Sequence, residues 1–86
     1  MLITLDLGNG ETVEINPKYI ALIEVKIDCQ YTYEICYNVY IIDRLIQVWT
    51  RPYRDHEGGN EEEYKSKYEL AVRRLHLITE YASKEK

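Results

Sequence analysis

One stretch of the chain restricts the possible folds more than any other, because its side chains largely alternate between apolar and polar. This stretch, residues 29–42, reads Cys-Gln-Tyr-Thr-Tyr-Glu-Ile-Cys-Tyr-Asn-Val-Tyr-Ile-Ile. Every second side chain in it is apolar or aromatic: Cys29, Tyr31, Tyr33, Ile35, Tyr37, Val39 and Ile41. Successive side chains of a β-strand point to opposite faces, so a period of two predicts a strand with one apolar face. We therefore expect a central strand over about 30–42, after a short turn near Cys29-Gln30.

The residues before this stretch predict a hairpin and a third strand. Apolar and polar side chains alternate over 1–7 and 11–15, and Gly8-Asn9-Gly10 between them suits the positive φ of a tight turn. Pro17 cannot donate a hydrogen bond to a neighbouring strand, so the pairing should stop there and a short helical turn can follow. A strand over 21–28 comes next, with three side chains expected to face the core: Ile23, Val25 and Ile27.

The second half predicts one more strand, a loop and a long helix. A strand over 45–51 ends at Pro52, with a helix over 43–49 as the alternative. The polar segment 52–60 contains two consecutive glycines, which indicates an exposed loop. Asn60 can cap a helix over 61–83, with Glu63 completing a capping box. Apolar side chains recur in this helix at spacings of three and four, which makes one stripe that should pack on the sheet. The stripe consists of Tyr64, Tyr68, Ala71, Leu75, Ile78 and Ala82.

These elements predict an α+β fold, in which an antiparallel meander of four to five strands carries the long C-terminal helix on one face. At 86 residues the chain has the size of a single domain, residues 1–86. Its content of 45% hydrophobic and 30% charged residues is typical of a folded protein rather than a disordered one.

Three short motifs near the N-terminus follow one another closely. They are Leu5-Asp6-Leu7-Gly8-Asn9-Gly10, then Ile15-Asn16-Pro17, then Ile20 with Ile23-Glu24. This order resembles the start of the small flagellar FlbD-type proteins and of related short phage and bacterial reading frames. The resemblance implies a strand, an Asn-Gly turn, a second strand and an Asn-led turn over less than a third of the chain. It implies no function, and after Glu24 the sequence departs from that family's pattern.

The composition limits the location and the partners of the protein. The net charge is −4, from 15 acidic and 11 basic residues, which disfavours non-specific binding to nucleic acid because such binding requires a basic surface. No apolar run approaches the ~20 residues of a membrane span. No secretory leader is visible, and the two cysteines suit reduced thiols. We therefore expect a cytoplasmic protein without a membrane partner.

No motif in the sequence indicates catalysis, a metal or a cofactor. His56 lies between Asp55 and Glu57, but consecutive side chains diverge and no further His or Cys stands at ligand spacing. No phosphate-binding glycine loop is present, and no Ser or Cys stands in a nucleophile motif. We therefore expect a protein that is not an enzyme and has no catalytic residues, metal ligands or cofactor.

The aromatic residues point to a contact surface instead. The chain has nine tyrosines and one tryptophan but no phenylalanine, so every ring carries a polar group. Tyrosine, tryptophan and arginine are enriched among the residues that dominate protein interfaces. The predicted partner-binding residues are Tyr31, Tyr33, Tyr37, Tyr40, Trp49, Arg51, Tyr53 and Arg54.

A second stripe on the predicted helix lies about a quarter-turn from the first, at 100° per residue. Its members are Leu70, Arg74, Leu77 and Tyr81. One sheet face does not easily bury both stripes, so the second stripe predicts an oligomer interface. The alternative is that the helix is well buried within the fold of one chain.

The leading functional hypothesis is a small non-enzymatic module that binds another protein, with a homodimer as the expected assembly. Small acidic proteins rich in tyrosine are frequent among phage-encoded inhibitors, so a phage-type inhibitor or regulator of a host protein is one form of this hypothesis. The alternative is a module that binds a nucleotide or single-stranded nucleic acid through Arg51, Tyr53 and Arg54. Guanidinium groups bind phosphate in bidentate fashion and aromatic rings stack on bases, which makes this alternative chemically reasonable.

Overall fold

The chain forms strands, two short 3-10 helices and one long α-helix in the computed structural model, which describes residues 2–42 and 44–85. The strands are β1 (Ile3–Asp6), β2 (Thr12–Ile15), β3 (Ile20–Cys29), β4 (Glu34–Ile41) and β5 (Arg44–Trp49). The helices are η1 (Pro17–Tyr19), η2 (Asp55–Glu57) and α1 (Glu61–Glu85). The predicted α+β class is confirmed, although Met1 of the predicted first strand lies outside the described residues.

The strands form two antiparallel sheets instead of one. β3, β4 and β5 pair in that order, which confirms the predicted meander for three strands. Among the described strands, β1 and β2 pair only with each other. The chain leaves β2 through η1, where the Asn16 side chain accepts a hydrogen bond from the Lys18 amide and Pro17 has no amide hydrogen. This turn separates β2 from β3, so the expected sheet of four to five strands is divided.

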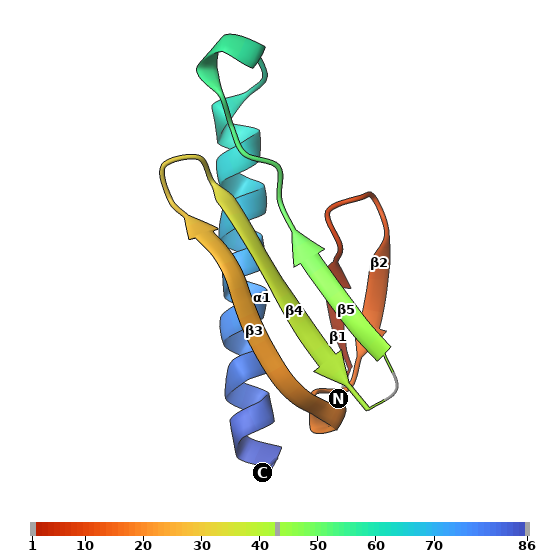
Figure 1. Ribbon diagram of the computed structural model, residues 1–86. Helices are drawn as coiled ribbons and strands as arrows, with labels where there is room; N and C mark the ends of the chain where they lie inside the picture. Colours follow the sequence, from red (N-terminus) through yellow and green to blue (C-terminus); the bar gives the residue numbers. More distant parts are fainter. Residues whose placement is uncertain (1, 43, 86) are drawn as a thin grey trace.

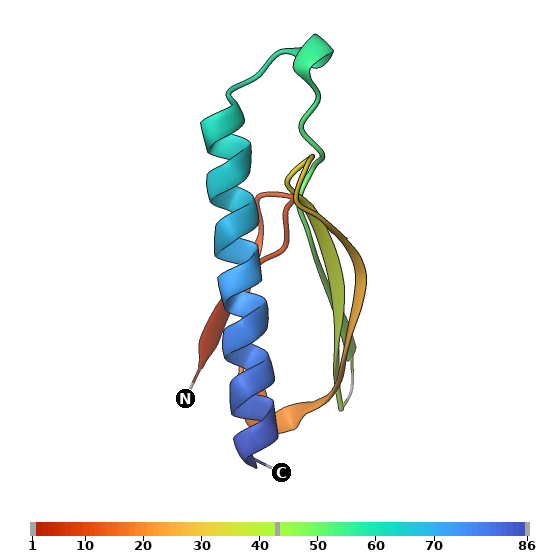
Figure 2. The ribbon, with the colours of Figure 1, turned by 90° about the vertical axis from the view of Figure 1, so that its left-hand side faces the viewer.

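The fold has two layers. α1 and the β1–β2 hairpin lie side by side and cover one face of the three-stranded sheet (Figure 1, Figure 2). Apolar side chains from the helix, the hairpin and the sheet meet in one core between the layers. Its buried members are Ile3, Leu5, Ile15, Ile20, Ile35, Tyr37, Val39, Ile46, Val48, Tyr68, Ala71, Leu75, Ile78 and Ala82.

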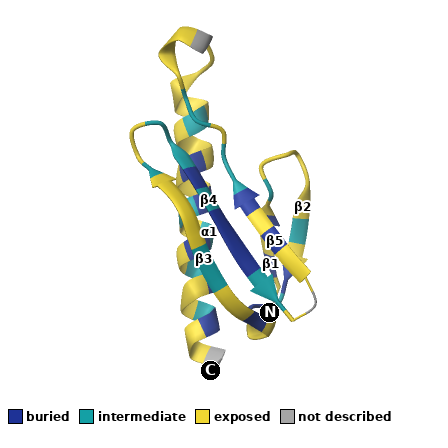
Figure 3. Ribbon diagram, viewed as in Figure 1, coloured by how far each residue is buried: buried dark blue, intermediate teal, exposed yellow. Residues whose placement is uncertain are grey.

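The alternation that predicted the central strand holds from Ile35 onward and fails before it. Ile35, Tyr37 and Val39 are buried, and β4 is the most buried strand of the molecule as described (Figure 3). Residues 30–33 form the turn between β3 and β4, so β4 is shorter than the predicted strand over 30–42. Tyr33 has a φ of 55°, in the left-handed region, which is incompatible with an extended strand.

β3 is an edge strand whose alternation is interrupted. Its pairing with β4 shifts between Ile20 and Leu22 and again between Val25 and Ile27. The second shift places Ile27 opposite Cys36, on the face of the sheet away from α1, where it is 42% exposed. The expectation that Ile27 faces the core is therefore wrong. Val25 stays opposite the buried Tyr37 but is itself exposed, because it lies at the edge that α1 does not fully cover.

α1 begins and packs as the sequence predicted. The side-chain oxygen of Asn60 accepts a hydrogen bond from the Glu62 amide at 2.9 Å, which caps the helix. Glu63 was expected to complete a capping box, but its carboxylate forms an ion pair with Lys67 Nζ at 3.4 Å instead. The predicted apolar stripe is buried from Tyr68 to Ala82. None of the helices within 2–42 and 44–85 is long and apolar enough to cross a bilayer.

Candidate interaction surfaces

The face of the three-stranded sheet that points away from α1, here called the outer face, carries no covering element among those described (Figure 1, Figure 2). Paired residues of neighbouring strands lie on the same face of a sheet, so the register identifies its side chains. They form three rows across the strands. The first row is Leu22, Tyr40 and Leu45, the second is Glu24, Asn38 and Gln47, and the third is Ile27, Cys36 and Trp49.

The second row is polar, and its members bond to one another. Asn38 is only 6% exposed, and its side-chain amide is hydrogen-bonded on both sides. It donates to Glu24 Oε1 at 3.5 Å and accepts from Gln47 Nε2 at 3.2 Å. The Tyr40 hydroxyl donates to the same Glu24 oxygen at 3.3 Å. Lys26 Nζ lies 3.2 Å from Glu24 Oε1, and this hydrogen-bonded ammonium lowers the pKa of Glu24. The row is therefore satisfied internally and its charge is balanced.

The first and third rows place large apolar side chains in contact with solvent. Leu22 is 56% exposed, Leu45 is 53% exposed and Ile27 is 42% exposed. Apolar side chains gathered on one uncovered face are typical of a surface that docks against another molecule. None of these three residues was predicted as a contact residue. The alternation of the strands could have identified Leu22 and Leu45. Each directly precedes an apolar residue that faces the core, Ile23 or Ile46, so each must point to the opposite face of the sheet.

Only some of the predicted partner-binding residues lie on the outer face. Tyr40 belongs to the outer face by register, and Tyr31 is 95% exposed in the turn between β3 and β4. Trp49 pairs with Cys36 at the end of the third row, but its ring lies beside Gly8 of the hairpin turn, where a Cβ atom would be 3.1 Å from Trp49 Cδ2. Tyr37 is fully buried, and its hydroxyl donates to the Ala71 carbonyl oxygen at 3.3 Å. Burial strongly raises the pKa of Tyr37. Tyr37 is therefore a core residue, and we leave it out of the contact surface.

Tyr33 and Tyr53 belong to a cluster of rings beside the first turns of α1. Tyr33 lies 6.4 Å from Tyr53 and 6.2 Å from Tyr68 between ring centroids, and Tyr53 packs edge-on against Tyr64 at 5.5 Å. The Tyr33 hydroxyl donates to Glu61 Oε1 at 3.0 Å, which raises the pKa of Tyr33. A hydrogen bond to Asp55 raises the pKa of Tyr53 in the same way. These two rings attach the loop after β5 to the helix.

The two predicted arginines are separated. Arg51 lines a groove of about 630 Å³ between the β1–β2 turn, the end of β5 and α1. Arg54 is exposed before η2 and is not among the residues that line this groove. Of the predicted triplet Arg51, Tyr53 and Arg54, only Arg51 lines this groove.

The second helix stripe is only partly covered within the chain, since Leu70 is 43% exposed. Leu77 and Tyr81 are half-buried against the core, and α1 contacts both η1 and β1. Arg74 and Leu70 line the groove beside the hairpin. The hairpin had been expected to extend the main sheet, but it lies beside α1 and covers part of this stripe. The oligomer interface at the stripe stays a prediction.

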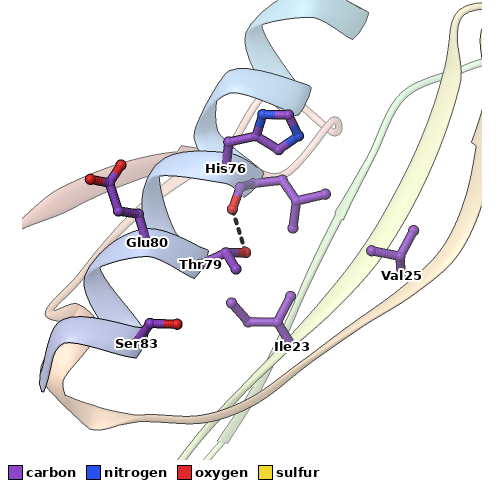
Figure 4. Close-up of a pocket in the computed structure, with 7 residues that line it drawn as sticks. Ile23, Val25, His76, Thr79, Glu80 and Ser83 are labelled. Carbon is purple, nitrogen blue, oxygen red and sulfur yellow. Dashed lines mark hydrogen bonds between the residues drawn. The ribbon is translucent and has the colours of Figure 1, made fainter. Parts of the chain in front are cut away.

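A second, shallower groove of about 520 Å³ lies between β3 and the C-terminal half of α1. Figure 4 shows Ile23 and Val25 facing the helix across it, while Glu80 points away. The Thr79 hydroxyl donates to the Leu75 carbonyl oxygen at 2.7 Å, so it is occupied within the helix. This groove is the open side of the core at the β3 edge.

Among residues 2–42 and 44–85, no three or more His, Cys, Asp or Glu side chains are grouped so that they could hold a metal ion. Cys29 and Cys36 are free thiols on neighbouring strands, β3 and β4.

No known protein family, characterised protein or solved structure matches the chain.

Proposed function

We propose that this protein is a non-enzymatic interaction module that binds another protein through the outer face, and that a second copy of the chain occupies this face in the isolated protein. The observation that carries the proposal is the arrangement of two exposed apolar rows on either side of an internally bonded polar row. Burial of the apolar rows would supply the free energy of binding, at roughly 25 cal/mol per Å² of apolar surface before the costs of association.

The symmetry of the rows supports a homodimer. A two-fold axis that lies between two outer faces, either along or across the strands, places the polar row of one copy against the polar row of the other. The apolar rows then meet apolar rows, as an interface between identical patches requires. Lys26 neutralises Glu24 within each chain, so like charges would not oppose one another across the axis.

Tyr40 is the large ring of the first row. Such side chains commonly contribute most of the binding energy when an interface buries them. The same face would serve a heterologous partner, such as a host protein bound by an inhibitor of the phage type, in competition with the second copy. Tyr31, in the neighbouring turn, would extend this contact.

The Leu45→Lys substitution tests the proposal, because a charge in the first apolar row would be buried without a partner in the dimer. By size-exclusion chromatography with light scattering at micromolar concentration, we expect the wild type to be a dimer. The dimer dissociation constant of Leu45→Lys should rise by at least about tenfold.

The matched control is Leu2→Lys, since Leu2 is 63% exposed but lies before β1 in the other layer. It should dimerise as the wild type does, and circular dichroism should show that both variants are folded. A monomeric wild type, or equal weakening by the two substitutions, would contradict the proposed homodimer.

A further inference from the structure

The groove between the hairpin turn, the end of β5 and α1 is separate from the apolar rows of the outer face in every residue except Trp49. Its walls are the β1–β2 turn on one side and α1 on the other, with Tyr37 and Val48 from the sheet between them. A volume of about 630 Å³ lies within the range of about 300–1,000 Å³ that is usual for sites of small molecules. The groove is therefore large enough for a ligand of nucleotide size.

The charges in this groove favour an anion. Its charged lining side chains are Asp6, Arg51, Lys67 and Arg74. Asp6 already accepts a hydrogen bond from the Gly8 amide at 3.0 Å, and Lys67 is paired with Glu63. Arg51 and Arg74 have no hydrogen-bond or ion-pair partner among the residues that the structure describes. Two arginines that are far apart in sequence thus line one groove in an acidic protein.

Arg74 comes from α1, whereas Arg51 is exposed in the segment that follows β5. Arg74 lies on α1 one helical turn after Leu70 and beside the buried Ala71 and Leu75, and it is itself half-buried. Arg74 and the buried Tyr37 both line the groove. Arg51 directly follows Thr50, whose hydroxyl accepts from the Ile35 amide and donates to the Tyr33 carbonyl oxygen.

The remaining walls of the groove include aromatic rings. Trp49 and Tyr64 line it together with the backbone of Gly8-Asn9-Gly10. An aromatic ring can stack on a planar base, and a guanidinium group can bind two phosphate oxygens at once. A ligand that joins a planar ring to a phosphate would use both features, whereas inorganic phosphate would use only one.

We propose that this groove binds a mononucleotide, with Arg51 and Arg74 holding the phosphate and Trp49 and Tyr64 contacting the base. The sequence predicted a nucleotide site formed by Arg51, Tyr53 and Arg54. The proposed site keeps Arg51 but uses Arg74 instead of Arg54 and Tyr64 instead of Tyr53. It does not depend on the proposed dimer, because both arginines lie outside the outer face.

Trp49 is the single tryptophan of the chain, so its fluorescence reports on the site directly. We expect titration with AMP to change this fluorescence with saturation, and adenosine or inorganic phosphate alone to bind at least about tenfold more weakly. Arg51→Gln and Arg74→Gln should each weaken AMP binding by about 10- to 100-fold, since each removes a charge-assisted hydrogen-bond donor. Added salt should also weaken binding, because the attraction is between charges.

Two controls match these substitutions. Arg73 neighbours Arg74 on α1 but is exposed and does not line the groove, and Arg54 is near Arg51 in sequence but also lies outside it. Arg73→Gln and Arg54→Gln should leave AMP binding within about twofold of the wild type. The dimer variant Leu45→Lys should also bind AMP normally, which separates failure of this site from failure of the proposed interface.

Several results would overturn the site. They are the absence of saturable AMP binding, a loss with Arg54→Gln in place of Arg74→Gln, and binding of a single-stranded oligonucleotide without binding of AMP. Thermal unfolding of each variant shows whether it is folded, and Arg51→Lys and Arg74→Lys provide milder changes that keep the charge. These variants should bind more weakly than the wild type but more tightly than the glutamine variants, because a lysine lacks the planar fork.

Discussion

At the scale of single residues, the tyrosine hydroxyls show how a chain without phenylalanine builds an aromatic core. Each ring that enters the core must find a hydrogen-bond partner for its hydroxyl, since a buried polar group without one is costly. The pairs are Tyr33 with Glu61, Tyr37 with Ala71 and Tyr68 with Asp28. Each pair joins α1 to the sheet or to the turn between β3 and β4, so the hydroxyls connect the two layers as well as filling space.

Tyr68→Phe tests one of these links by its dependence on pH. The Tyr68 hydroxyl donates to Asp28 Oδ1 at 2.5 Å, and this hydrogen bond, together with burial, raises the pKa of Tyr68 from 10.0 to about 12. Because the folded protein keeps the proton when the unfolded chain loses it, the contribution of the bond is complete below pH ~10. It is lost as the pH rises through ~12.

Near pH 8, the free energy of unfolding of Tyr68→Phe should be about 1–2 kcal/mol below that of the wild type. In chemical unfolding experiments this difference should shrink between pH ~10 and ~12. A difference that is constant across this range would show that the phenol proton has no part in the interaction.

At the scale of elements, the hairpin turn is attached to the end of β5 by a close backbone contact. A Cβ atom on Gly8 would lie 1.9 Å from the Trp49 carbonyl oxygen and 3.1 Å from its ring atom Cδ2. Gly8 also has a φ of 87°, which favours glycine. Residue 8 therefore serves both the turn and the docking of the two sheets against each other.

Gly8→Ala and Gly10→Ala separate these two roles. Gly10 has a φ of 90°, but a Cβ atom there would meet nothing within 4 Å, so Gly10→Ala should cost only the backbone strain of about 1–2 kcal/mol. Gly8→Ala should cost about 1–3 kcal/mol more, because the hairpin must move away from β5. Urea unfolding of the two variants measures the difference, and equal losses would argue against tight docking of the turn.

At the scale of the whole molecule, one core is shared by parts that could not be stable alone. The molecule is narrow, with extents of 44 × 21 × 19 Å, and α1, at about 37 Å for its 25 residues, spans most of the long dimension. A two-stranded hairpin is marginal in water by itself. Here the hairpin buries Ile3, Leu5 and Ile15 against the helix and the larger sheet. We therefore expect the layers to unfold together.

Leu5→Ala tests this cooperativity, because Leu5 is fully buried in the hairpin. The loss of its side chain should lower the free energy of unfolding by about 2–5 kcal/mol. The midpoints measured by Trp49 fluorescence and by the helical circular dichroism signal should shift equally at one protein concentration. Leu2→Ala, at an exposed position, should have little effect, and a shift in the fluorescence midpoint alone would show that the hairpin unfolds separately.

The elements themselves could be predicted where the signal was local. Period-two burial from Ile35 to Val39, the Gly-Asn-Gly turn, the Asn60 cap and the apolar stripe of α1 each depend on residues close together in the chain. Local backbone geometry and side-chain periodicity are sufficient for such features. The sequence by itself therefore determined the fold class, the alternation of β4 and the apolar stripe of α1.

The surfaces were decided by tertiary structure, because they depend on contacts between distant residues. A shift in register moved Ile27 to the outer face, and η1 placed the hairpin beside α1 instead of at the edge of the sheet. That position buried part of the second helix stripe and brought Arg51 and Arg74 to one groove, although they are far apart in sequence. Neither the register of an edge strand nor the side on which a hairpin packs follows from local periodicity, since both are set by which long-range contacts bury the most apolar surface.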